Sequence, residues 1–304
     1  GWAGLLNKGI VEPLSPRSVS GILPLGGTIL GTSRTNPLKN PEHMAQVQEN
    51  LRRYEIDALV AIGGDDTLSV AVHLHEQGVR VVGVPKTMDN DLSGTDYTIG
   101  FHSAVQIVAD ALDKLHTTAS SHHRVLVVEV MGRDAGWVAV VGGLAGGADF
   151  ILIPEVETHI EEVCQHLQRR RELGKDSSIV VVAEGARVGG VEIRDSEERD
   201  AFGHVRLDRR NVGELVSREI ERRTGFETRV TVLGHLQRGG SPTMFDRVLA
   251  SRLGVAAVDY IHEGRFGYMP GLRGTELVPV PLAEAVGKSK TVDLSLYELA
   301  KVFY

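Results

Sequence analysis

Runs of β-branched and aliphatic residues alternate with helical patterns along most of this chain. Six short runs are nearly continuous in Val, Ile and Leu; they span residues 57–62, 79–84, 125–130, 150–153, 178–183 and 228–233. Strands of this composition are covered on both faces, as in a parallel sheet. Helical patterns lie between them, over residues 66–77, 101–117, 135–148, 159–173, 212–223 and 243–262. The alternation predicts βαβ crossovers and an α/β fold, a three-layer αβα sandwich.

The composition is that of a globular protein with a net negative charge. The 304 residues include 33 Lys and Arg against 40 Asp and Glu, a formal charge of −7, which argues against a nucleic-acid partner or an anionic membrane surface. The single cysteine, Cys164, excludes an intrachain disulfide and is typical of a reducing compartment. The least polar stretch, residues 135–148, is too short to cross a bilayer. We therefore expect a cytoplasmic protein.

Two acidic turns follow two successive predicted strands. The first, residues 63–67, reads Gly-Gly-Asp-Asp-Thr, and the second, residues 85–91, reads Pro-Lys-Thr-Met-Asp-Asn-Asp. The carboxyl ends of neighbouring parallel strands meet at one edge of a sheet, and in open α/β sheets ligands bind at that edge. Crowded carboxylates repel one another, so the pair of turns indicates a bound divalent cation and a proton acceptor. This combination is typical of a phosphoryl transferase.

The first turn has the form of a phosphate-approach loop. Gly64 lets the backbone come close to a ligand, and a helix starting near Asp66 and Thr67 offers free N–H groups and a positive dipole end. Asp65 is the candidate Mg²⁺ ligand, directly or through water. Taken alone, a helix cap after a tight turn explains the same residues equally well.

The second turn carries the candidate general base. Transfer of a phosphoryl group to an alcohol needs an acceptor for the hydroxyl proton, and Asp89 is placed to serve, with Asp91 beside it. Thr87 is expected to contact substrate or phosphate. The alternative is an Asn/Asp-rich turn whose side chains cap their own backbone. Two such turns at consecutive strand ends favour a functional site.

Three further segments carry candidate contacts for an anionic substrate. Arg34 ends a glycine- and hydroxyl-rich loop that either grips phosphate oxygens or is a surface turn. Arg133 follows a predicted strand and either neutralises charge on the transferring group or is a solvated helix-start arginine. His235 and Arg238, in a glycine-rich segment after the last strand, suit a sugar phosphate, and Glu184 suits sugar hydroxyls.

Together these motifs resemble the 6-phosphofructokinase family, in the family's order, from about Gly26 to the C-terminal region. The resemblance implies two similar lobes with mainly parallel sheets. Residues 1–100 with part of the C-terminal region would form the lobe that binds the donor, pyrophosphate or ATP. Residues from about 101 to 250 would form the lobe that binds fructose 6-phosphate, with the chain crossing between lobes. The family's opening βα unit, roughly 40 residues, is expected to precede Gly1.

The resemblance also implies roles for individual residues. The catalytic residues would be Asp89, which deprotonates the sugar 1-hydroxyl, with Thr87, Asp91 and Arg133. The donor-binding residues would be Arg34, Gly64, Asp66, Thr67 and Lys86, with Asp65 associated with Mg²⁺. The substrate-binding residues would be Arg124, Met131, Gly132, Arg133, Glu184, Arg229, His235 and Arg238. Arg124 and Arg229 match arginines that reach into a neighbouring subunit's site, which implies a homodimer or homotetramer.

Two positions bear on the phosphoryl donor. ATP-using members of the family typically have Gly where this chain has Asp66 and Lys86, and small residues there leave room for the α-phosphate of the nucleotide. Both positions resemble the pyrophosphate-dependent branch, so we expect reversible transfer from pyrophosphate to fructose 6-phosphate. An ATP-dependent 6-phosphofructokinase is the nearest alternative. A non-catalytic subunit that only binds sugar phosphate is a second, disfavoured because Asp65, Asp89 and Arg133 are all retained.

Overall fold

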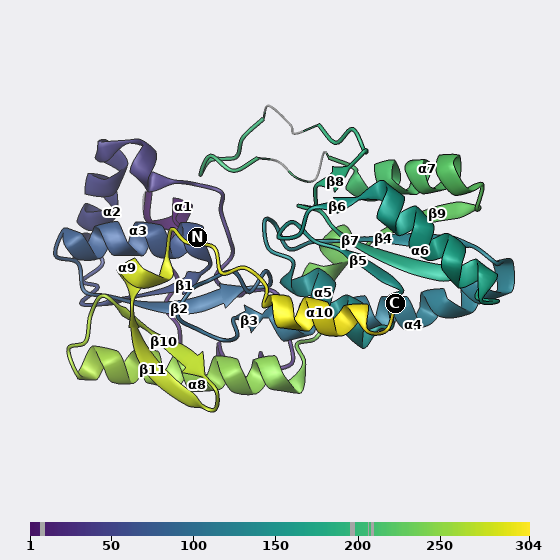
Figure 1. Ribbon diagram of the computed structural model, residues 1–304. Coiled ribbons are helices and arrows are strands. Elements are labelled where there is room, and N and C mark those ends of the chain that lie inside the picture. Colours follow the sequence, from purple (N-terminus) through teal and green to yellow (C-terminus); the bar gives the residue numbers. More distant parts are fainter. Residues whose placement is uncertain (7–9, 195–197, 206, 208–209) are drawn as a thin grey trace.

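The computed structural model describes residues 1–6, 10–194, 198–205, 207 and 210–304. Two lobes lie side by side, each with a sheet covered by helices on both faces (Figure 1). This arrangement confirms the predicted α/β fold with its three layers. Among the described residues, none of the helices has the length and apolar composition needed to cross a bilayer.

The first lobe holds a mixed sheet in the order β1-β2-β10-β11, with β3 paired to β2. Its strands are β1 (Leu59–Gly63), β2 (Val81–Thr87), β3 (Ile99–Gly100), β10 (Tyr268–Arg273) and β11 (Glu276–Pro281). Its helices are α1 (Ala3–Leu6), α2 (Pro41–Arg53), α3 (Asp65–Glu76), α8 (Met244–His262) and α9 (Leu282–Ala285), with the 3₁₀ turn η1 (Pro37–Lys39). Strand β2 is parallel to β1, β3 and β10, whereas β10 and β11 form an antiparallel hairpin. Leu249 and Leu253 of α8 cover one face of β2, and α2 and α3 pack on the other side of the sheet.

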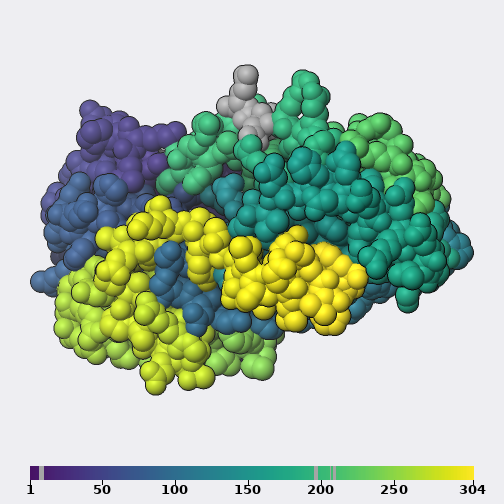
Figure 2. All heavy atoms as spheres, in the orientation of Figure 1, coloured from purple at the N-terminus to yellow at the C-terminus, as the bar shows by residue number. Residues whose placement is uncertain are grey.

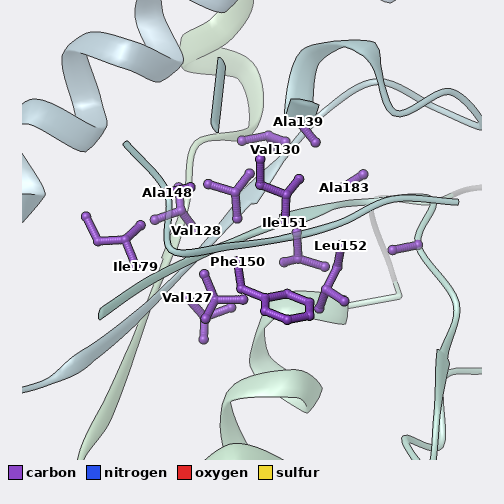
Figure 3. Packing of buried hydrophobic residues seen from close by; sticks show 14 of the residues in the cluster. Val127, Val128, Val130, Ala139, Ala148, Phe150, Ile151, Leu152, Ile179 and Ala183 are labelled. Atoms are coloured by element: carbon purple, nitrogen blue, oxygen red, sulfur yellow. The ribbon is translucent and has the colours of Figure 1, made fainter. Parts of the chain in front are cut away.

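The second lobe holds a sheet in which all neighbouring strands are parallel, in the order β5-β7-β4-β9. Its strands are β4 (Val125–Val130), β5 (Phe150–Leu152), β7 (Ser178–Ala183) and β9 (Thr228–Val232). Its helices are α4 (Phe101–His122), α5 (Trp137–Ala145), α6 (Ile160–Glu172), α7 (Val212–Thr224) and α10 (Leu294–Lys301), with η3 (Gly234–Arg238) after β9. A separate parallel pair joins β6 (Thr158–His159) to β8 (Val188–Gly189). Figure 3 shows Val127, Val128 and Ile151 packed with their neighbours in the core of this lobe.

The six predicted strands and six predicted helices are all present. Strands β4 and β7 begin and end at the predicted residues, because both are buried along their whole length. The β10–β11 hairpin has no counterpart in the sequence prediction. Pro270, Gly271 and Pro279 lie inside it, and residues of these types weaken a strand pattern.

The chain crosses between the lobes more than once. Helix α8 returns to the first lobe, and the segment after α9 then crosses back so that α10 packs on the second (Figures 1 and 2). Lys290 holds the segment after α9 in place. Its backbone N donates to Asp91 O at 2.7 Å, and its carbonyl accepts from Trp137 Nε1 at 2.8 Å. The two sheet edges that face each other are therefore held together close to the second acidic turn.

Candidate active site

A cavity of about 580 Å³ lies between the lobes. The predicted site residues that line it are Gly64, Asp65, Asp66, Thr67, Lys86, Thr87, Asp89, Asp91, Arg133 and Arg238. They come from the ends of β1 and β2 in one lobe and from the segments after β4 and β9 in the other. The parallel-sheet edges thus bring together residues up to 174 positions apart in the sequence, from Gly64 to Arg238.

The first acidic turn is shaped by glycine and by the start of α3. A Cβ on Gly63 would lie 2.4 Å from the Cβ of Thr67, so this tight entry into the helix leaves no room for a side chain. Gly64 is the N-cap, and its carbonyl accepts from Thr67 N at 3.1 Å. Asp65 Oδ1 accepts from Gly287 N at 2.7 Å, which fixes one carboxylate oxygen in the mouth of the cavity.

The second acidic turn is anchored by a buried asparagine. Asn90 has a φ of 54°, a left-handed conformation that Asn tolerates better than most residues, and its Oδ1 accepts from Thr98 N at 3.0 Å. This anchor holds Asp89 and Asp91 on either side of it. Thr87 Oγ1 donates to Asp89 Oδ2 at 3.2 Å and accepts from Asp89 N at 3.1 Å. Asp89 Oδ1 and Asp91 Oδ1 are buried and have no hydrogen-bond partner among the residues that the structure describes.

The carboxylate of Asp91 lies close to that of Asp89 in this turn. Burial, followed by repulsion from Asp89, raises the pKa of Asp91 to about 6. A cation placed between such groups relieves both the burial cost and the repulsion. The described residues contain no cluster of three or more His, Cys, Asp or Glu side chains arranged to hold a metal by themselves. Mg²⁺ commonly binds to one or two carboxylates while keeping water and substrate phosphate as further ligands, and the residues present fit that mode.

Arg133 enters the cavity from the second lobe on a strained turn. Its φ is 52°, and Gly132 before it has a φ of 150°. Glu184 Oε1 accepts from both backbone N–H groups, at 3.2 Å from Gly132 N and 3.1 Å from Arg133 N, and so holds this turn in place. Arg133 Nη2 lies 3.6 Å from Asp66 Oδ2 across the gap between the lobes. An arginine from one lobe therefore faces the carboxylates of the other.

The remaining predicted residues do not line the cavity. They are Arg34, Arg124, Met131, Gly132, Glu184, Arg229 and His235. Arg34 and His235 are exposed. Arg124 and Arg229 both pair with Glu227 Oε1, at 2.8 and 2.6 Å. These two arginines come together at the opposite end of the second sheet from Arg133, away from this cavity.

Two residues at the site, Asp246 and His204, are not identified by the sequence analysis. Asp246, buried in the first turn of α8, accepts from Gly100 N at 2.9 Å and Ser103 N at 2.7 Å, so it caps α4 rather than its own helix. His204 Nε2 lies 2.8 Å from Asp66 Oδ1. His204 belongs to the polar segment between β8 and α7, whose composition is typical of an exposed loop. Neither contact can be recognised from a local sequence pattern, because each joins residues more than 130 positions apart.

Comparison with known proteins gives consistent matches. A family model described as phosphofructokinase matches residues 1–261. The chain is 55% identical to the pyrophosphate–fructose 6-phosphate 1-phosphotransferase of Streptomyces coelicolor, covering 100% of this chain and 88% of that protein. It is 47% identical to the ATP-dependent 6-phosphofructokinase of Corynebacterium efficiens, with the same coverage. Phosphofructokinase from Saccharomyces cerevisiae superimposes with a TM-score of 0.78 at 33% identity, over 93% of this chain and 40% of the yeast one.

Proposed function

Because the chain belongs to the phosphofructokinase family, we propose that it transfers a phosphoryl group from pyrophosphate to the 1-hydroxyl of fructose 6-phosphate. The products are fructose 1,6-bisphosphate and phosphate, and the reaction is a reversible step of glycolysis. In this assignment the first lobe binds the donor. The second lobe binds the sugar phosphate, and transfer takes place in the cavity between them.

The observation that carries the choice of donor is the placement of Asp66. Its carboxylate lies beside the Gly63–Gly64 turn, with His204 2.8 Å from one oxygen and Arg133 3.6 Å from the other. A side chain held in this way adds bulk and negative charge where a nucleotide would bring its α-phosphate. Like charges brought together in a binding site cost several kcal/mol. Pyrophosphate has no third phosphate and fits this arrangement better than ATP.

The proton of the sugar hydroxyl goes to Asp89. The hydrogen bond from Thr87 Oγ1 orients this carboxylate, and its Oδ1 is left free to accept the proton as the new O–P bond forms. Arg133 faces the same space and stabilises the negative charge carried by the phosphoryl oxygens. Arg238, Lys86 and Thr67 supply further donors to phosphate from the cavity wall.

Mg²⁺ is the cofactor that the carboxylates would hold. Asp65 is its candidate ligand, with the unpartnered oxygen of Asp91 close to the same turn. When bound, the ion neutralises charge on the donor phosphates. Lys86, at the end of β2 in the same lobe, and Arg238, from the other lobe, contribute positive charge to the cavity wall.

The sugar-phosphate site is proposed to extend over Met131, Gly132, Glu184 and His235. Arg124 and Arg229 lie apart from this cavity, and we assign them to the site of a neighbouring copy, where they hold the 6-phosphate. This makes the active form a homodimer or homotetramer. Arg34 would reach the donor phosphates.

Turnover with pyrophosphate and with ATP, measured side by side at saturating fructose 6-phosphate, tests the proposal. We expect a higher kcat/KM with pyrophosphate. Replacing the two donor-selecting residues together, Asp66→Gly with Lys86→Gly, should shift the ratio of the two kcat/KM values toward ATP by about tenfold or more. The KM for fructose 6-phosphate serves as the internal control and should stay constant. Faster turnover of the unaltered protein with ATP would overturn the assignment of the donor.

A further inference from the structure

Residues 198–205, here called the docking turn, belong to the second lobe by sequence but lie against the first. Figure 1 shows this turn, between β8 and α7 in the sequence, over the gap between the lobes. Asp200 Oδ1 accepts from Phe202 N at 2.9 Å and from His204 N at 3.0 Å. Arg199 and Val205 form an antiparallel bridge at its base. The backbone on which His204 sits is therefore fixed by the turn's own hydrogen bonds.

Two contacts fasten the docking turn to the first lobe. The Phe202 side chain packs against the hydrophobic core that includes Met44 and Leu68. The Ala201 carbonyl accepts from Asn36 Nδ2 at 3.3 Å. Apolar packing next to a hydrogen bond gives the turn one position on this surface. His204 therefore lies at the edge of the cavity on a segment that is packed against the first lobe.

At the cavity edge, His204 completes a set of contacts around Asp66. His204 Nε2 lies 2.8 Å from Asp66 Oδ1, and Arg133 Nη2 lies 3.6 Å from Asp66 Oδ2. Arg133 Nη2 also lies 4.0 Å from Asp200 Oδ2. The docking turn therefore contacts Asp66 through His204 and Arg133 through Asp200. With a cationic or hydrogen-bonding group on each oxygen, the Asp66 carboxylate has one favoured rotamer. Without His204, Arg133 alone would hold the Asp66 carboxylate, among the contacts described.

We infer that His204 is a positioning residue for the phosphoryl donor, acting through Asp66. This inference rests on the proposed function, since it assigns Asp66 to the donor side of the cavity. His204 donates a hydrogen bond to Asp66 and holds its carboxylate to one side. Donor phosphates can then enter next to Gly64 without meeting a mobile anion. Among the described contacts, His204 has none with Met131, Gly132, Glu184 or His235, so we expect the affinity for fructose 6-phosphate to be independent of this residue.

The test is steady-state kinetics of His204→Ala and His204→Gln. We expect His204→Ala to raise the KM for pyrophosphate about fivefold, because a partly exposed hydrogen bond to a charged group is lost. The KM for fructose 6-phosphate should change by less than twofold. A glutamine amide can still donate to Asp66, so His204→Gln should return the pyrophosphate KM to within about twofold of the original. A matched control is His73→Ala: His73 is on the same helix as Asp66, and among the hydrogen bonds described its ring contacts only Ser69 O of its own helix, so both KM values should be unchanged.

A second comparison shows whether His204 acts through Asp66. In an Asp66→Gly background, adding His204→Ala should have no further effect on the donor KM. A fivefold effect that persists in this background, or an equal rise in both KM values for His204→Ala alone, would overturn the inference. Calorimetric titration with magnesium pyrophosphate gives the same comparison without turnover. Turnover with ATP only would overturn the proposed donor. The KM values for ATP and for fructose 6-phosphate of the His204 variants, each divided by that of the unaltered protein, would then still decide the role of His204.

Discussion

The two strand edges that face each other across the cavity differ in the sign of their charge. The first lobe presents four carboxylates after β1 and β2, on Asp65, Asp66, Asp89 and Asp91. The second lobe presents the guanidinium groups of Arg133 and Arg238 after β4 and β9. Both edges arise from the same βα geometry, so the fold alone does not set this difference. The residue types placed in the turns do.

The difference divides the chemical work between the lobes. Carboxylates can accept a proton and hold a cation, whereas arginines match the oxygens of phosphate with a fork of donors. The rigidity of the two edges also differs. Glu184 fixes the turn of Arg133 from the end of a strand of the all-parallel sheet, but the first acidic turn depends on contacts from elsewhere: Gly287 for Asp65 and His204 for Asp66. The acidic edge is thus the one that neighbouring segments can adjust.

The largest expected effect comes from removing the proton acceptor of the acidic edge. Asp89→Asn keeps the size of the side chain but cannot take the hydroxyl proton, so kcat should fall by about 10³-fold. Binding of fructose 6-phosphate, measured by calorimetry, should persist. Asp110→Asn is the control, because Asp110 lies on the surface of α4 and, in the part of the chain that the structure describes, its side chain bonds only to Gln106. A loss of less than tenfold for Asp89→Asn would assign the proton to another group.

Removing the charge of the opposite edge should have a smaller effect. Arg133→Gln retains a donor but not the positive charge, and we expect kcat to fall by about 10²-fold, the usual effect of losing one group that stabilises transition-state charge. Arg218→Gln is the matched control, since Arg218 pairs only with Glu214 on an exposed helix face among the contacts described. If Arg133→Gln raised only the KM for the sugar and left kcat intact, the basic edge would bind substrate without assisting transfer.

The contrast between the lobes also shows what sequence can predict of the fold. The all-parallel sheet of the second lobe is visible in the sequence because both faces of its strands are covered, as in β4 and β7. In the first lobe, β2 is buried over most of its length and is visible for the same reason, whereas β1 is visible from its aliphatic run. The β10–β11 hairpin is not, because Pro270 and Pro279 stand opposite each other within it. Its strand character depends on pairing with β2 rather than on local propensity.

The site likewise has a part that the sequence predicts and a part that depends on distant contacts. The acidic turns and Arg133 could be predicted because each directly follows a strand of the sheet, where chain direction sets the side chain's surroundings. The capping of α4 by Asp246 and the contact of His204 with Asp66 could not be predicted. Both depend on how distant segments dock, Asp246 through the return of α8 and His204 through the packing of Phe202. The positive φ values of Asn90 and Arg133 likewise have no signature in the sequence.

The smallest expected effect is on stability and comes from the crowding of the acidic edge itself. Burial and the nearby Asp89 raise the pKa of Asp91 from an ordinary 3.8 to about 6. Between these pH values the folded protein binds more protons at this position than the unfolded chain, so the free energy of unfolding falls as pH rises through this window. Above about pH 6 the full cost of the ionised Asp91 is present, and below about pH 4 it is absent.

Asp91→Asn removes that cost without changing the size of the side chain. In the absence of Mg²⁺ and phosphates, it should raise the free energy of unfolding at pH 7.5 by about 1 kcal/mol, because Asp91 keeps partial contact with water and repulsion from Asp89 is screened. Thermal melts should show a Tm about 2 °C higher at pH 7.5 and no gain at pH 3.5. Asp110→Asn should show no pH-dependent gain. An equal gain at both pH values would mean that Asp91 affects stability through packing, and that the acidic edge carries no electrostatic strain for a cation to relieve.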